Sequence, residues 1–231
     1  MITERLNEVR TRILRAKETG TNSAEHVKLI AVSKTFPLEQ ILAAAADGQQ
    51  CFGESKVQEF TEKFNARPDL EWHLIGHLQT NKVRNIIGKT VLIHSLDRLD
   101  LAKELEKRSA NADLCTHCLV QVNIAEEETK SGLLVPELSD FLDAMADYPH
   151  LRIDGLMTIG PHTDDMIAVR QCFAKLRELR DREKAVSRPN TDLRELSMGM
   201  STDFEIAVEE GATLLRVGSL IFGERDYSHV R

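Results

Sequence analysis

A single lysine ends the first apolar, β-branched run of the chain, and it is the residue best suited to covalent chemistry. The run covers residues 27–33, Lys34 follows it, and Pro37 then stops the extended segment. A lysine at the end of a buried strand either extends its ammonium group to solvent or, with a lowered pKa, forms a Schiff base at the mouth of an α/β sheet. Lys34 by itself leaves both interpretations open.

A loop near the C-terminus, residues 197–205, has the composition of an anion site. Gly199 allows the backbone to approach a ligand closely, and Ser197 and Ser201 offer hydroxyl donors. Thr202 and Glu205 have the spacing of a capping box, which predicts that a helix starts there and presents unpaired N–H groups. The alternative is an ordinary helix cap that binds no ligand.

A second loop of the same kind, residues 217–223, contains Gly218 and Ser219 and leads into what we expect to be a short extra helix. Arg216 lies in the apolar run just before it. Because arginine stays charged, a buried arginine needs a partner, which is either a carboxylate deeper in the fold or a bound ligand.

Length and composition predict one domain, residues 1–231, with 42% hydrophobic residues and a net charge of −7. The acidic balance and 5% aromatic content argue against a nucleic-acid or anionic membrane partner. We find no apolar run of about 18 residues and no signal-peptide pattern, so we expect a cytoplasmic protein without a membrane span. We expect a monomer, although the sequence leaves the oligomeric state open.

The four cysteines do not predict a metal site or a disulfide framework. Cys115 and Cys118 have the spacing of a metal or redox motif, but they fall in a predicted strand, where residues three apart point to opposite faces. We expect them and Cys51 to pack in the core.

Predicted strands and helices, which must position these residues, alternate along the whole chain. After a helix over 2–17, we expect strands at 27–33, 50–52, 71–75, 91–95, 115–122, 151–157, 192–196 and 213–217. The helices between and after them are expected at 38–46, 57–64, 82–87, 99–111 (capped by Asp97), 136–148, 165–184 and 203–211. Eight alternations predict a single (β/α)8 barrel of the TIM type with an extra N-terminal helix. The polar loop 126–132 is either a lid or solvated surface.

In such a barrel, active sites form at the carboxyl ends of the strands, and the loops after strands 7 and 8 often bind phosphate. Lys34 and both loops are predicted at that end. An amine, a phosphate site and a buried arginine together suit a phosphorylated aldehyde, of which pyridoxal 5′-phosphate (PLP) is the common cofactor. A phosphosugar aldolase or isomerase would need the same groups and remains an alternative. No dinucleotide or P-loop motif is present in the sequence.

Eight motifs, in order along the chain, resemble one family. They are residues 31–35 (AVSKT), 52–54 (FGE), 57–59 (VQE), 72–82 (WHLIGHLQTNK), 130–132 (KSG), 155–157 (GLM), 196–201 (LSMGMS) and 217–223 (VGSLIFG). In these motifs the chain resembles the pyridoxal phosphate homeostasis protein family. The resemblance implies a fold-type III PLP barrel like that of alanine racemase, without that enzyme's second domain.

The resemblance also implies roles for particular residues. Lys34 would form the Schiff base with PLP, and Arg216 would face the pyridine nitrogen. The other cofactor-binding residues that it implies are Ser197, Gly199, Ser201, Gly218 and Ser219 at the phosphate, with Met157 and Ser55. Ser55 stands where many members of the family have asparagine, so it offers fewer hydrogen bonds at that position.

The resemblance implies a protein that binds and releases PLP, with no established turnover reaction and with apo-PLP enzymes open as recipients. An arginine at the pyridine nitrogen can only donate, which weakens the cofactor as an electron sink. A second acid/base is expected to be lacking, since Tyr148 is predicted at the far end of the barrel and Tyr227 in the C-terminal tail. An amino-acid racemase-like PLP enzyme and a Schiff-base phosphosugar aldolase are the alternative functions.

Overall fold

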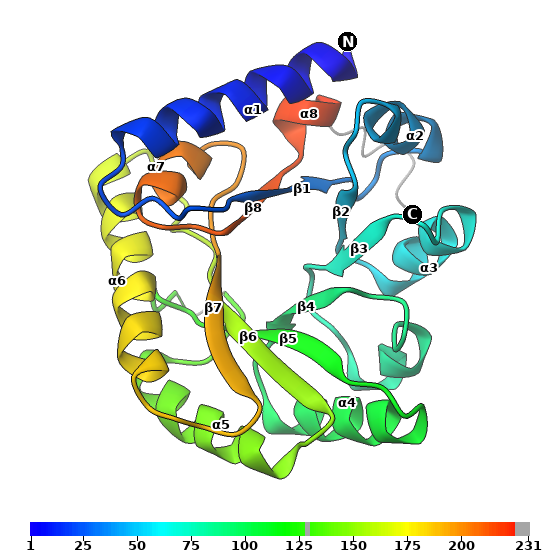
Figure 1. Cartoon of the computed structure of the whole chain (residues 1–231), viewed down its shortest axis with the longest axis vertical. Helices are drawn as coiled ribbons and strands as arrows, with labels where there is room; N and C mark the ends of the chain where they lie inside the picture. Colours follow the sequence, from blue (N-terminus) through cyan, green and yellow to red (C-terminus); the bar gives the residue numbers. More distant parts are fainter. Residues whose placement is uncertain (128–129, 225–231) are drawn as a thin grey trace.

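Eight short apolar runs pair in parallel, and in the computed structural model of the chain they close into a barrel (Figure 1). The structure describes residues 1–127 and 130–224. Each strand pairs with its neighbour in the sequence, and the last pairs with the first. The strands are β1 (Lys28–Val32), β2 (Cys51–Glu54), β3 (Glu71–Leu74), β4 (Leu92–Leu96), β5 (Thr116–Gln121), β6 (Leu151–Met157), β7 (Thr191–Ser197) and β8 (Leu214–Val217). The predicted barrel is confirmed.

Helices surround the barrel and connect successive strands. The α-helices are α1 (Ile2–Thr19), α2 (Leu38–Ala46), α3 (Val57–Ala66), α4 (Leu99–Asn111), α5 (Leu138–Ala144), α6 (Met166–Lys184), α7 (Phe204–Glu209) and α8 (Ser219–Phe222). The described ranges also contain the 3₁₀ helices η1 (Thr80–Asn85), η2 (Val135–Glu137) and η3 (Met145–Asp147). None of the helices in the described ranges is long and apolar enough to cross a bilayer.

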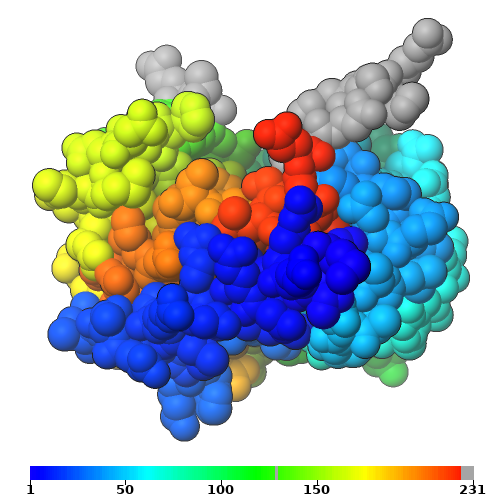
Figure 2. All heavy atoms as spheres, turned by 90° about the horizontal axis from the view of Figure 1, so that it is seen from above, coloured from blue at the N-terminus to red at the C-terminus, as the bar shows by residue number. Residues whose placement is uncertain are grey.

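The N-terminal helix α1 covers the barrel beside the last two helices. Leu6, Val9 and Ile13 recur at helical spacing and are buried against α7, α8 and α2. Arg12 forms an ion pair with Glu205 of α7 at 2.7 Å. Figure 2 shows α1, in blue, lying across this side of the molecule with α7 in orange and α8 in red next to it.

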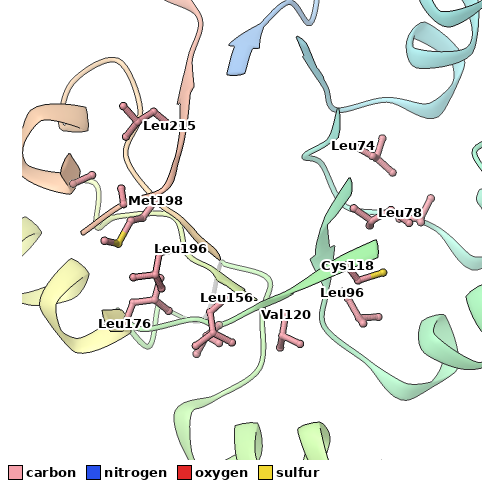
Figure 3. Close-up of a cluster of buried hydrophobic side chains, with 14 of the residues drawn as sticks. Leu74, Leu78, Leu96, Cys118, Val120, Leu156, Leu176, Leu196, Met198 and Leu215 are labelled. Atoms are coloured by element: carbon pink, nitrogen blue, oxygen red, sulfur yellow. The ribbon is translucent and has the colours of Figure 1, made fainter. Parts of the chain in front are cut away.

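The core has two layers, because alternate strand residues point inward and outward. The outer layer lies between the strands and the helices; Figure 3 shows Leu156 and Leu196 there, beside Leu176 of α6. A smaller apolar cluster is separate from it and consists of Ile30, Cys51, Leu92, Leu119, Met157 and Leu214. Its members come from strands or from their ends, on the face opposite the helices, so this cluster fills part of the barrel interior.

Three predictions about helices and their caps were wrong. The helix expected at 82–87 is the 3₁₀ helix η1, since so short a segment with asparagine and β-branched residues does not sustain an α-helix. Asp97 does not cap α4: Arg98 occupies the cap position, and Asp97 instead pairs with the Arg98 guanidinium. Thr202 and Glu205 form no capping box, because Asp203 is the N-cap residue of α7 and the Glu205 carboxylate is held by Arg12.

Cys115 and Cys118 lie in different environments. Cys118 is buried, but Cys115 is exposed just before β5, so the expectation of core packing was wrong for Cys115. The strand begins one residue later than expected, which leaves Cys115 in the preceding loop.

Gly155 tests how tightly the strands of the barrel pack. A Cβ at this position of β6 would lie 2.0 Å from the carbonyl oxygen of Glu195 in β7. We expect Gly155→Ala to lower the free energy of unfolding by about 3 kcal/mol, because backbone rather than a mobile side chain must move. Urea unfolding monitored by circular dichroism measures this change.

Gly48→Ala is the matched control for Gly155→Ala. Gly48 has a φ of +80°, but a Cβ added there would meet no atom within 4 Å, so alanine costs only the backbone strain of about 1 kcal/mol. Equal losses in the two variants would contradict the steric explanation.

Candidate functional site

A cavity of about 220 Å³ opens at the carboxyl ends of β1 and β8. Its lining consists of Val32, Lys34, Ile75, Met200, Ser201, Thr202, Arg216, Gly218 and Ser219. It therefore brings together five of the nine residues predicted to bind a cofactor. A lysine, an arginine and two of the predicted serines line one small space.

The backbone turns sharply just after Lys34. Thr35 has a φ of +71°, a conformation that a β-branched residue rarely adopts. Its N–H donates to Glu59 Oε1 at 2.6 Å, which holds the turn. Strain of this kind persists only where surrounding contacts fix the backbone, so the direction in which Lys34 leaves β1 is set by its neighbours.

A buried charged network lies next to this turn. Lys63 of α3 donates to Glu54 and to Glu59, each at 2.7 Å, and to the backbone oxygen of Ser33 at 2.7 Å. The Ser33 hydroxyl donates to the same Glu54 oxygen at 2.7 Å. Burial raises the pKa of Glu54 to about 7, although Lys63 opposes the rise. The second oxygen of Glu54 is buried without a hydrogen-bond partner in the described part of the chain.

Arg216 reaches inward from β8 and is 5% exposed. It donates through Nη1 to Ser197 Oγ at 2.6 Å and through Nη2 to the carbonyl oxygen of Thr158 at 2.8 Å. Within the described ranges it forms no ion pair, so the alternative of a carboxylate partner deeper in the fold is not observed. Burial lowers the pKa of Arg216 to about 10, opposed by the charge of Asp203, and the guanidinium remains positive at neutral pH.

A chain of buried polar groups continues from Arg216 across the barrel interior. Ser197 Oγ lies 2.8 Å from His94 Nδ1, and His94 Nε2 lies 3.0 Å from His73 Nδ1. Burial lowers the pKa of His73 to about 4 and that of His94 well below its usual value. Both imidazoles are therefore neutral at pH 7, and the positive charge on this chain stays with Arg216.

Four of the predicted cofactor-binding residues are in the described part of the chain but outside the cavity lining: Ser55, Met157, Ser197 and Gly199. The Ser197 hydroxyl is engaged by His94 and Arg216, so in this structure it positions the arginine. Gly199 has a φ of +89°, and a Cβ there would lie 2.5 Å from that of Ala207. Cofactor contacts by these four residues stay predictions.

The two loops contact each other at the cavity. Gly218 N donates to Ser201 Oγ at 3.3 Å, which joins the loop after β7 to the loop after β8. Asp203 Oδ1 accepts a hydrogen bond from Met200 N at 2.6 Å and fixes the turn that presents Ser201. Both loops line the same cavity as Lys34.

Sequence reasoning missed both buried networks. The strand parity of His73 and His94 gave a signal, because both residues occupy predicted strands where alternate positions face the interior. Tyr148 precedes β6 and so lies at the opposite end of the barrel from Lys34, as predicted. Tyr227 lies outside the described residues, and so does part of the polar loop 126–132, for which a lid and a solvated surface were the two interpretations.

Comparison with known proteins places this lysine-bearing barrel in the class built like the N-terminal domain of alanine racemase. The sequence profile of that domain matches residues 5–226. An alanine racemase from Corynebacterium glutamicum shares this fold, with a TM-score of 0.68 and 17% identity; the match covers 96% of this chain and 63% of that one.

Within that class, the chain belongs to the pyridoxal phosphate homeostasis protein family. It is 46% identical over 229 residues to the protein of that name from Aquifex aeolicus, covering 97% of this chain and 98% of the relative. It also matches the structure of PipY from Synechococcus elongatus with PLP bound, at a TM-score of 0.84 and 34% identity, covering 96% of this chain and 100% of PipY. The family resemblance seen in the sequence motifs is confirmed.

The raised pKa of Glu54 predicts a pH-dependent stability. The folded state holds a proton on Glu54 up to a pKa of about 7, whereas the ordinary value is 4.5, so this residue's contribution to stability falls as pH rises through that window. We expect the stability of Glu54→Gln relative to wild type to increase between pH 5 and 7, on the order of 2 kcal/mol. Urea unfolding at a series of pH values measures it.

Glu62→Gln on helix α3 provides the control, because the Glu62 side chain is exposed and takes no part in the buried network. Its stability should follow that of wild type at every pH. Parallel curves for wild type and Glu54→Gln would contradict the shifted pKa.

Proposed function

We propose that this protein binds PLP reversibly through a Schiff base on Lys34 and serves in PLP homeostasis. The observation that carries the proposal is the shared cavity, which Lys34 lines together with Ser201, Ser219 and Arg216. The names of the Aquifex relative and of the PLP-bound PipY structure support the same ligand.

The residues at the cavity fit the chemistry of this cofactor. The hydroxyls of Ser201 and Ser219, with backbone N–H groups at the start of α8, are donors suited to a phosphate. Arg216 brings a positive charge that no carboxylate in the described ranges pairs with, which favours an anionic ligand. Lys34 supplies the amine, placed by the turn at Thr35.

The arginine favours holding the cofactor over fast chemistry on it. PLP, when bound, supplies an aldehyde for the amine and a pyridine ring that serves as an electron sink when its nitrogen is protonated. Arg216 can only donate hydrogen bonds, and Ser197 and Thr158 fix two of its nitrogens. A guanidinium that faces the pyridine nitrogen therefore does not keep that nitrogen protonated. Tyr148 lies at the far end of the barrel and cannot serve as a second acid/base at the cavity.

The proposal extends to the fate of the bound cofactor and to where the protein acts. A protein that holds PLP without consuming it can pass the cofactor to apo-PLP enzymes, and we propose that it does so in the cytoplasm and as a monomer. The strained turn beside Lys34 and the buried Glu54–Lys63 network support a site that is formed before the ligand binds.

Lys34→Ala tests the covalent link. We expect wild type to shift the visible absorption of PLP and to gain the mass of one reduced PLP after borohydride treatment, because the imine is trapped on the lysine. Lys34→Ala should show neither effect, since no other lysine lines the cavity in the described part of the chain. Absorption spectroscopy and intact mass spectrometry are the measurements.

Lys184→Ala, an exposed lysine at the end of α6, is the control and should behave as wild type. An unchanged PLP spectrum with wild-type protein would overturn the proposal. A borohydride-trapped adduct with a ketose phosphate would instead support the aldolase alternative, and Lys34-dependent turnover of an amino acid would support the racemase alternative.

A further inference from the structure

A second group of reactive side chains lies at the opposite end of the barrel from Lys34. Cys51, Glu71 and His73 each offer one ligand atom, and these atoms lie within 4.8 Å of one another. Cys51 Sγ is 3.1 Å from Glu71 Oε2. None of these residues lines the PLP cavity, so the group is not part of the proposed cofactor site.

The strand register brings the three side chains together. Cys51 begins β2 and is the direct partner of Glu71, which begins β3. His73 is two residues further along β3 and therefore points to the same face as Glu71, into the barrel interior. The three donors thus sit on rigid, paired strands, which fix their separations better than a loop would.

His73 has a ring nitrogen with no partner in the described structure. The side chain is 2% exposed, and its Nδ1 is engaged by His94 at 3.0 Å. Its Nε2 is buried and makes no hydrogen bond within the described ranges. A buried imidazole nitrogen left unsatisfied is costly, and a bound ligand at this position would remove that cost.

Glu71 already pairs with a positive charge. The Lys28 ammonium group lies 2.9 Å from Glu71 Oε2. The Lys28 side chain is about half exposed, so it can leave without unfolding β1. A cavity of about 480 Å³ at this end of the barrel is lined by Lys28 and His73 and gives an ion a path from solvent.

We propose that Cys51, Glu71 and His73 form a Zn²⁺ site with a fourth position open to this cavity. A thiolate, a carboxylate and an imidazole are the donor types that zinc takes, and three protein ligands with one open position are typical of its accessible sites. Tetrahedral bond lengths place sulfur and oxygen donors about 3.5 Å apart, close to the separation of Cys51 and Glu71. Small side-chain rotations close the remaining gap to His73.

Zn²⁺ binding at this site changes no oxidation state, at the metal or at any ligand. The S–H bond of Cys51 breaks as the Zn–S bond forms, and the proton passes to solvent. Glu71 exchanges the Lys28 ammonium group for the metal, and Lys28 keeps its proton as it moves outward. His73 binds through the lone pair of Nε2 as a neutral imidazole and keeps its contact with His94.

Cobalt substitution tests the site directly. Chelator-treated protein, kept reduced without added thiol, is titrated with Co²⁺ and then with Zn²⁺ as competitor. We expect one equivalent of Co²⁺ to give a thiolate-to-metal charge-transfer band that Zn²⁺ displaces. Cys51→Ser should lose the band, whereas Cys115→Ser, which removes the exposed cysteine, should keep it.

Lys28→Met supplies a test that does not remove a ligand. It abolishes the competing ammonium group, so we expect Co²⁺ to bind about tenfold more tightly, and Glu71→Gln to bind about tenfold more weakly. These two variants decide the question if Cys51→Ser does not fold by circular dichroism. The proposal is overturned if no saturable one-to-one band forms, if Cys115→Ser abolishes it, or if Lys28→Met and Glu71→Gln both leave the affinity unchanged.

Discussion

The buried guanidinium of Arg216 needs hydrogen-bond partners, and neutral groups of the barrel interior supply them. An arginine cannot shed its charge, and removing it from water is costly unless hydrogen bonds replace the water. Ser197 and the Thr158 carbonyl supply those bonds, and His94 in turn orients Ser197. Because these partners are neutral, the positive charge is not cancelled by them and remains available to an anion in the cavity.

The rim that holds Lys34 depends on a different kind of constraint. The lysine follows a strand, but the turn that aims it requires a left-handed conformation at Thr35. Glu59 holds the turn from α3, and Lys63 ties Glu59 to Glu54 of β2. The two sides of the cavity are thus built by different means, a salt-bridged support beside the lysine and two glycine-containing loops on the other side.

Much of this architecture could be predicted from local sequence patterns. The apolar runs gave the strands, since a fully buried parallel strand needs a continuous apolar stretch, and helical periodicity located α1 and α6. The position of Lys34 after β1 followed from the run alone. The contact of His94 with Ser197 did not, because it joins residues 103 positions apart across the barrel interior. The ends of some elements were also predicted wrongly, because a tertiary contact outweighed a local one. The Glu205 carboxylate, for example, pairs with Arg12 and does not cap helix α7.

The row of His73, His94 and Ser197 has a further consequence for the positions of protons. Each neutral imidazole carries one proton, and the two rings share a hydrogen bond, so the proton of one ring determines that of the other. Only two arrangements satisfy the row: both rings donate toward Ser197, or Ser197 donates and both rings direct their protons toward the His73 end. Exchange between them carries one proton in at His73 Nε2 and one out at Ser197, with no displacement of the backbone. The proton positions at His73 and at Ser197 are therefore coupled, although the heavy atoms of the row stay where they are.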